Sequence, residues 1–202
     1  MGLMQQAGGM DVNSLMQRLR RLAMLDTTVF DEVRGDKNST IPAIVVVVVA
    51  TLLSGIGGWL FYLMQDYHLK SGEFFVKSAI LGSILAIIVW AIGWLGVTYV
   101  MLTQVFRARA DVNELVRVMG FAAAPLALTL GLVIPGLDYG IGLAALGLTF
   151  GANQIAIQSA TDAPAGKALV ANAAGFAVWV IIMQLFVGTT NTYAPGIFIF
   201  AR

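Results

Sequence analysis

The sequence predicts an all-α integral membrane protein with five transmembrane helices, preceded by a cytoplasmic amphipathic helix at the membrane surface. Its 202 residues are 58% hydrophobic and 11% charged, which leaves too few polar side chains to cover a water-soluble globule of this size. Five apolar runs are long enough to cross a bilayer. Each must be helical, because a backbone in hydrocarbon has to satisfy its own hydrogen bonds.

The composition also excludes several classes of function. There is no cysteine and only one histidine, so disulfide frameworks and Cys/His metal sites are ruled out. The formal net charge of +1 offers no basic surface for neutralising phosphates, so we expect no nucleic-acid partner. No cofactor or metal is expected.

The N-terminal part predicts a helix that lies on the membrane rather than across it. Residues 1–10 show no periodicity and are expected to form a mobile tail. In the cytoplasmic amphipathic region that follows, 11–40, apolar residues recur at helical spacing with arginines between them. Such a helix would sit in the headgroup region with its arginines on anionic lipid, although the groove of a partner subunit fits the same pattern. The residues concerned are Val12, Leu15, Met16, Leu19 and Leu22, with Arg18, Arg20 and Arg21.

A second, shorter helix should connect this segment to the membrane domain. Residues 26–28, Asp-Thr-Thr, supply an N-cap, and three apolar residues after them share one helical face: Val29, Phe30 and Val33. Residues 38–40, Asn-Ser-Thr, precede a proline and form another cap, so the first membrane span should begin near Ile41.

The five-helix transmembrane domain is expected over 41–188, followed by an external C-terminal tail at 189–202. The predicted spans are 41–64, 76–102, 116–134, 139–160 and 168–188. In the third, Pro125 should kink the helix, and Pro135-Gly136 should end it in a tight turn before the fourth.

Small residues at spacings of four predict close contacts between helices. The sequence leaves open whether these faces meet within one bundle or between subunits. They are Ala50, Ser54 and Gly58 in the first span, Gly147 and Gly151 in the fourth, and Ala171 and Gly175 in the fifth.

Lysines and arginines are unevenly divided between the two sides of the predicted bundle. Nine of the twelve fall on the side of the N-terminus. Because cytoplasmic loops carry an excess of positive charge, the N-terminus should be cytoplasmic and, with an odd number of spans, the C-terminus external. We therefore expect a multi-pass protein of the cell (inner) membrane.

The polar residues within the spans indicate packing rather than catalysis. All acidic residues fall in tails, loops or span ends, and no nucleophile and base pair is available, so we expect no enzyme. His68 is expected to be a solvated loop residue. Counted from the turn between the last two spans, Asn153 and Asn172 are level near mid-membrane, so Asn172 should bond to Asn153 or Gln154. The alternative is a polar site for a lipid headgroup or a solute.

Two stretches resemble the Ypt-interacting protein (Yip) domain family, in particular its short prokaryotic-type branch. They are LRRLAMLDTTVFDEVRGDKNST, before the first span, and MGFAAAPLALTLGLVIPGL, in the third. The resemblance runs from about residue 15 to 188. The residues that match the N-terminal motif are Leu25, Asp26, Phe30, Glu32 and Asp36, and those that match the Gly-aromatic-small-Pro run are Gly120, Phe121, Ala124 and Pro125. Phe121 stands where the family frequently has tyrosine.

This resemblance implies a five-helix fold and a non-enzymatic scaffold or adaptor that organises partner proteins or lipids in the membrane. Eukaryotic relatives engage Rab-type GTPases through a longer N-terminal region with an Asp-Leu-Tyr-Gly-Pro motif. The motif is missing here, so the resemblance does not carry GTPase binding over to this chain. Two alternatives stay open: a transporter or channel for an uncharged solute or lipid, and an accessory subunit of a larger complex, which would bind other membrane subunits.

Overall fold

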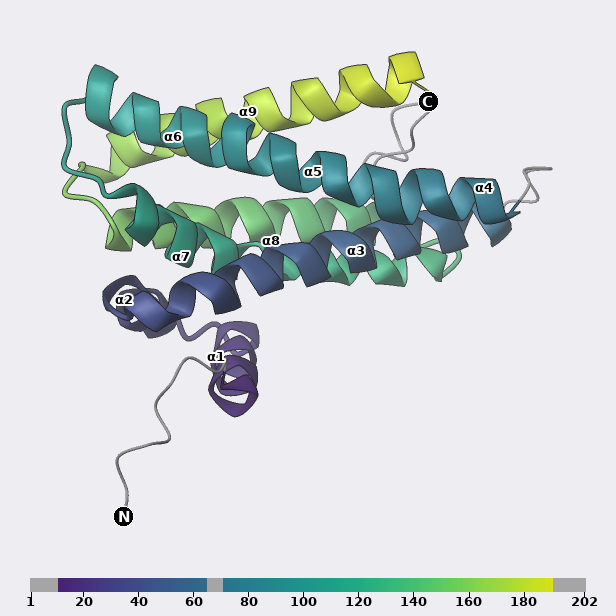
Figure 1. Ribbon diagram of the computed structural model, residues 1–202, viewed down its shortest axis with the longest axis horizontal. Helices are drawn as coiled ribbons and strands as arrows, with labels where there is room; N and C mark the ends of the chain where they lie inside the picture. Colours follow the sequence, from purple (N-terminus) through teal and green to yellow (C-terminus); the bar gives the residue numbers. More distant parts are fainter. Residues whose placement is uncertain (1–10, 65–70, 191–202) are drawn as a thin grey trace.

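The computed structural model describes residues 11–64 and 71–190, and their regular elements are helices. The long helices lie side by side, while α1 (Val12–Ala23) and α2 (Thr28–Gly35) sit at one end of the bundle (Figure 1). The predicted tail at 1–10, most of the predicted tail at 189–202 and His68 lie outside the described residues.

Five helices are long and apolar enough to cross a membrane, as the sequence predicts. The all-α membrane fold is therefore confirmed, with span boundaries that differ from the prediction by a few residues. The first span is α3 (Thr40–Met64), entered through the short η1 (Lys37–Ser39); the third joins α7 (Val112–Ala122) to η5 (Ala124–Val133); the fourth and fifth are α8 (Asp138–Ser159) and α9 (Ala165–Thr190).

The second span is the longest, covering Gly72–Val105, and alternates between α-helical and wider π-helical turns. Such wider turns are rare and occur mostly as single turns inside α-helices. Trp90 and Trp94 lie in one of them and are buried. The segments are α4 (Ser71–Phe75), η2 (Val76–Gly82), α5 (Ser83–Val89), η3 (Trp90–Gly96), α6 (Val97–Val100) and η4 (Met101–Val105).

The third span changes character at the predicted proline. The α-helix ends at Ala122, and Pro125 lies in the first turn of the 3₁₀ helix η5, where its missing N–H leaves no donor unsatisfied. The span stops at Ile134, and Gly136 adopts a left-handed φ of 79° that turns the chain into α8. The predicted break and hairpin are both present.

Glycines let neighbouring helices approach closely at the core. A Cβ at Gly57 would overlap the carbonyl of Thr129 in η5, and one at Gly120 would lie 2.8 Å from the Cβ of Ala43. Gly175 of α9 packs in the same way on the backbone of Trp94. The predicted contact faces of the first and fifth spans are confirmed as contacts within one bundle, with Ala50, Ser54, Gly58 and Ala171 all buried.

Candidate functional site

The N-terminal segment forms two helices joined by a strained turn. Asp11 caps α1 by accepting a hydrogen bond from the backbone N–H of Asn13 at 3.0 Å, which satisfies one of the free donors at the start of the helix. After Met24 the chain turns at Leu25, which has a left-handed φ of 63°. Leu25 is also 78% exposed, so its side chain is not held there by core packing.

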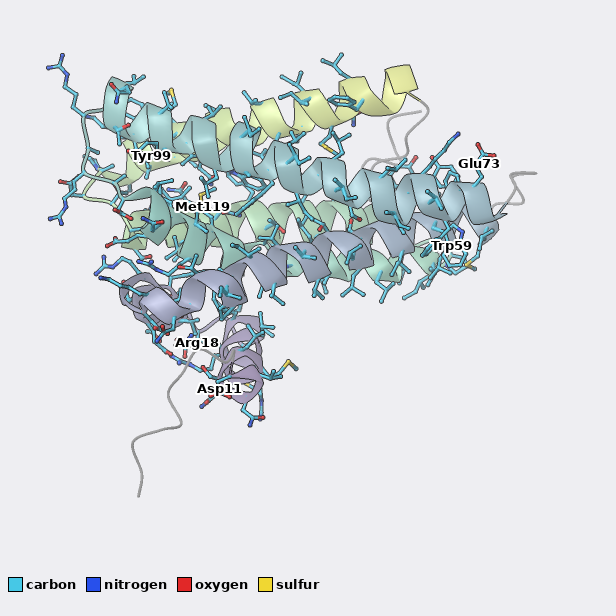
Figure 2. All side chains as sticks on the ribbon, in the orientation of Figure 1. Asp11, Arg18, Trp59, Glu73, Tyr99 and Met119 are labelled. Carbon is cyan, nitrogen blue, oxygen red and sulfur yellow. The ribbon has the colours of Figure 1, made fainter. Side chains whose placement is uncertain are left out.

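A cluster of ion pairs locks α1 onto α2, and we call it the clamp. Arg18 donates from Nε to Glu32 at 2.9 Å and from Nη2 to Asp36 at 3.0 Å. Arg21 donates from Nε to Asp26 at 2.8 Å and from Nη1 to Glu32 at 2.7 Å. Figure 2 places Arg18 at the junction between α1 and the bundle. The two arginines thus share Glu32, and the orientation of α1 is fixed by a network rather than by one isolated pair.

The clamp carboxyl groups are held ionised by their donors. Hydrogen bonds from the Thr28 side chain and then from Arg21 lower the pKa of Asp26 from 3.8 to about 2. The pKa of Glu32 is lowered chiefly by Arg21, and that of Asp36 chiefly by the hydroxyl group of Ser39. All three carboxyl groups are therefore negative at neutral pH and act as structural partners for the arginines.

This pairing corrects part of the prediction for α1. Arg18 and Arg21 were expected to face anionic lipid, but they are paired with three carboxylates that follow α1 in the chain. Arg20 is exposed and stays available to lipid. Of the predicted apolar stripe, Leu15 is buried and Leu19 and Leu22 are half-buried. Val12 and Met16 are 56% and 60% exposed, so their burial by lipid or a partner stays a prediction.

The second helix is anchored to the membrane domain. Val29, Phe30 and Val33 are buried, as their shared face predicts. Arg117 of α7, only 6% exposed, donates to the carbonyl of Arg34 from Nη2 at 2.6 Å and from Nε at 3.1 Å. Arg34 in turn donates to the carbonyl of Ser159 at the end of α8. The bundle thus fixes the position of α2, and the clamp fixes α1 on α2.

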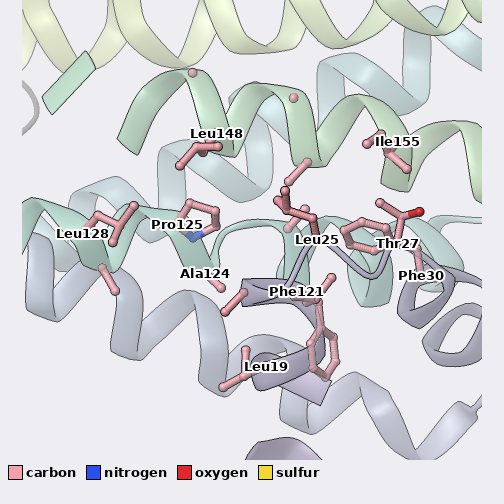
Figure 3. Close-up of a pocket in the computed structure, with 17 residues that line it drawn as sticks. Leu19, Leu25, Thr27, Phe30, Phe121, Ala124, Pro125, Leu128, Leu148 and Ile155 are labelled. Atoms are coloured by element: carbon pink, nitrogen blue, oxygen red, sulfur yellow. The ribbon is translucent and has the colours of Figure 1, made fainter. Parts of the chain in front are cut away.

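An apolar groove of about 700 Å³ lies between α1, the turn after it, α2, the Pro125 region and α8. In the close-up of Figure 3, Leu148 and Ile155 come from α8 on one side, and Pro125 and Leu128 from η5 on the other. Leu25 lies between the two sides (Figure 3). This size is typical of sites that enclose a small molecule, about 300–1,000 Å³.

The residues singled out from the sequence divide between the clamp and the groove. Asp26, Glu32 and Asp36 of the N-terminal motif belong to the clamp. The two apolar residues of the N-terminal motif line the groove together with residues of the third and fourth spans. The lining residues concerned are Leu25, Phe30, Phe121, Ala124, Pro125, Gly147 and Gly151. Gly120 lies outside the groove, against α3.

The prediction that Gly147 and Gly151 form a packed helix contact is wrong within this chain. Nothing lies within 4 Å of a Cβ built at either position. The spacing of small residues makes close approach possible, but here η5 stays far enough away that the two glycines form one wall of the groove instead. Packing of these glycines against another subunit, the other possibility that the sequence leaves open, stays a prediction.

The buried amides form a link between helices. Asn172 donates from Nδ2 to Oε1 of Gln154 at 3.3 Å and to the carbonyl of Phe150 at 3.2 Å, which confirms the predicted bond across α8 and α9. Its Oδ1 accepts from the indole N–H of Trp94 at 2.9 Å, a partner that the sequence does not indicate. Asn153 bonds within its own helix, to the carbonyl of Thr149 at 2.9 Å.

Comparison with known proteins identifies one family. The model of the Yip1 domain matches residues 26–189, which is the stretch from the N-terminal motif through α9. It covers α2 and all five spans, and it begins just after α1. No curated protein and no solved structure matches the chain.

Proposed function

This chain belongs to the Yip1 domain family, and we propose that it is a non-enzymatic membrane scaffold or adaptor whose N-terminal helix docks a partner protein. The observation that carries the proposal is that one side of α1 is held in place by ion pairs while apolar residues on the same helix are exposed. The clamp holds the helix by Arg18 and Arg21, while Val12 and Met16, on its apolar side, are exposed. An exposed apolar surface on a fixed support is typical of an interaction site.

The ionisable groups of the site support a binding role rather than catalysis. The clamp carboxylates are engaged by arginines, and the groove is lined by apolar side chains apart from Thr27. The described residues contain no group of three or more His, Cys, Asp and Glu side chains that could hold a metal ion. The chemistry that this arrangement offers is therefore recognition.

The same proposal includes an orientation, with α1 at the cytoplasmic face of the cell (inner) membrane. It follows from the excess of basic residues on that side. Single cysteines at Asn13 and Gly72 test it, because both positions are exposed and lie on opposite sides of the first span. A membrane-impermeant thiol reagent applied to intact cells should label position 72 and not 13. The reverse pattern would contradict the orientation.

Photo-crosslinking from α1 tests the adaptor role. A photo-reactive amino acid at Met16 of the full chain should crosslink to the same partner protein in repeated preparations. The matched control is Ile92, which is 71% exposed but lies within a span, and should crosslink to lipid only. Arg18→Gln should reduce crosslinking from Met16, because it loosens the clamp. Equal protein crosslinks from both positions, or none from Met16, would contradict the proposal.

The competing role, conduction of an uncharged solute or lipid, makes a different prediction. The mid-span amide of Asn172 bonds to side chains and backbone of the neighbouring helices, so it is part of the packing. Solitary protein that releases a trapped uncharged solute from liposomes would favour conduction. A partner recovered at equal stoichiometry, with no release, would favour the adaptor.

A further inference from the structure

The groove reaches from the membrane surface towards the middle of the bilayer. On α8 its residues run from Ile155, four positions before the end of the helix, back to Gly147. At 1.5 Å per residue this wall is about 12 Å long and begins about 6 Å from the helix end. That end is the one where α2 attaches, through the bond from Arg34 to Ser159. One end of the groove is therefore near the headgroup region and the other is surrounded by hydrocarbon.

We propose that this groove binds one acyl chain of an anionic phospholipid, with its phosphate beside Arg20. The inference goes beyond the adaptor role, because the groove is a ligand site distinct from the exposed apolar residues Val12 and Met16. Three features of the structure support it: the shape of the groove, its lining and the charge at its outer end.

The shape favours a chain over a helix. In Figure 1, α1 runs crosswise to the long helices, and Leu19, Leu22 and Ala23 form a wall of the groove. A partner helix that crossed the membrane along α8 would be about 10 Å wide and would collide with α1. An acyl chain is narrower and ends at the headgroup, which is the level where α1 lies, so it fits under the helix without displacing it.

The lining matches hydrocarbon. Its side chains are aliphatic, aromatic or absent, apart from the hydroxyl of Thr27. Gly147 and Gly151 keep a strip of α8 free of side chains, with nothing within 4 Å of the position of either Cβ. Because the groove belongs to membrane-spanning helices, lipid chains are the apolar molecules at the highest local concentration around it.

The charge near α1 selects an anionic headgroup. Arg20 follows Leu19 directly and lies one turn before Ala23, both of which line the groove. It is exposed, and among the described residues it has no ion pair, since the neighbouring carboxylates are occupied by Arg18 and Arg21. A guanidinium group is well suited to a phosphate, which it can bind through two parallel hydrogen bonds.

Photo-labelling with lipid tests the proposal directly. The full chain is placed in vesicles of equal parts phosphatidylcholine and phosphatidylglycerol, with a phosphatidylglycerol that carries a diazirine at the end of one chain. Leu148 lies in the groove and Val49 lies outside it on α3, with nearly the same exposure, 46% and 47%. They are also at similar depth, about 16 Å and 14 Å from the same end of the bundle. We expect labelling of Leu148 to exceed that of Val49.

Two variants test the groove and the charge beside it separately. Gly147→Leu combined with Gly151→Leu fills the groove, and labelling of Leu148 should fall to the level of Val49. Gly140→Leu is the matched control, because it adds the same side chain to the same helix at a position that is also open but outside the groove. Arg20→Gln adds no atoms to the groove but removes the positive charge beside it. It should therefore remove the preference for a diazirine-bearing phosphatidylglycerol over a diazirine-bearing phosphatidylcholine.

Equal labelling of Leu148 and Val49 in the unaltered chain would overturn the proposal, because it would show only the general lipid coat. A photo-reactive residue at Leu148 that crosslinks to protein rather than lipid would also overturn it and would identify the groove as a helix-docking face. Neither result bears on the crosslinks from Met16, so the adaptor role and the lipid site can fail independently.

Discussion

Replacing Asn172 by leucine tests how far one buried amide holds the last two spans against the second. Asn172 is completely buried, and its side chain bonds to two other helical segments: it accepts from Trp94 in η3 and donates to Phe150 and Gln154 in α8. Leucine has a similar size, so the substitution removes the hydrogen bonds without leaving a large cavity. The expected result is a folded but less stable protein.

The magnitude follows from which partners are left without a bond. The indole N–H of Trp94 loses its acceptor at 2.9 Å, whereas the carbonyl of Phe150 belongs to a helix that supplies its own donors. The bond to Gln154, at 3.3 Å, is long and contributes less. An unsatisfied buried donor costs about 1–3 kcal/mol, and hydrogen bonds between membrane helices average about 0.6 and reach about 1.7 kcal/mol. We therefore expect a loss of roughly 1–2 kcal/mol in the free energy of unfolding.

Reversible unfolding in mixed detergent micelles measures this loss. Asn153→Leu is the matched control: it is also buried on the neighbouring helix, but its Oδ1 has no hydrogen-bond partner among the described residues, so its replacement should cost less. A double-mutant cycle with Trp94→Phe should give a coupling energy near the cost of the indole bond. Equal stability losses for both asparagines, together with zero coupling to Trp94, would refute the reasoning.

Two further predictions concern the clamp and the glycines. The lowered pKa of Asp26 means that its pairing stabilises the N-terminal helices above pH 3.8 and is lost as pH falls towards about 2, so protease cleavage between them should rise over this range. Asp26→Asn should weaken that dependence and leave the part that comes from Glu32 and Asp36, whose pKa values are also lowered. Gly147→Ala should raise the free energy of unfolding by about 0.5–1 kcal/mol, because helical alanine loses less entropy, whereas Gly175→Ala should lower it by about 1–3 kcal/mol by overlapping Trp94. Unfolding in micelles distinguishes these signs.

The membrane spans could be predicted from the sequence because a backbone in hydrocarbon must satisfy its own hydrogen bonds, and a helix does this within one segment. Apolar runs of sufficient length must become helices, and Pro125 and Pro135-Gly136 mark a break and an end that hold whatever surrounds them. The π-helical turns around Trp94 could not be predicted. They depend on how the second span packs against α9, and local sequence does not contain that information.

The candidate site shows the same division between local and tertiary information. Helical spacing identifies the apolar face of α1, and the residue types at 26–28 indicate the start of α2, where the side chain of Asp26 accepts from the backbone N–H of Thr28. It does not determine that Arg18 turns to Asp36, eighteen positions on, or that Arg117 is buried under α2. The glycines of α8 are the clearest case, since their spacing predicts room for a neighbour and leaves open whether a neighbour is there.

The backbone conformation of Leu25 bears on the proposed function of the groove, whereas the packing of the Leu25 side chain within the chain does not. A left-handed φ of 63° costs a non-glycine residue about 1–2 kcal/mol, and glycine would adopt it without this penalty. Burial does not compensate, because the side chain is 78% exposed. Folding of the isolated chain would therefore favour glycine at position 25. The leucine places an aliphatic side chain at the groove, where the proposed acyl chain would cover it and offset the strain.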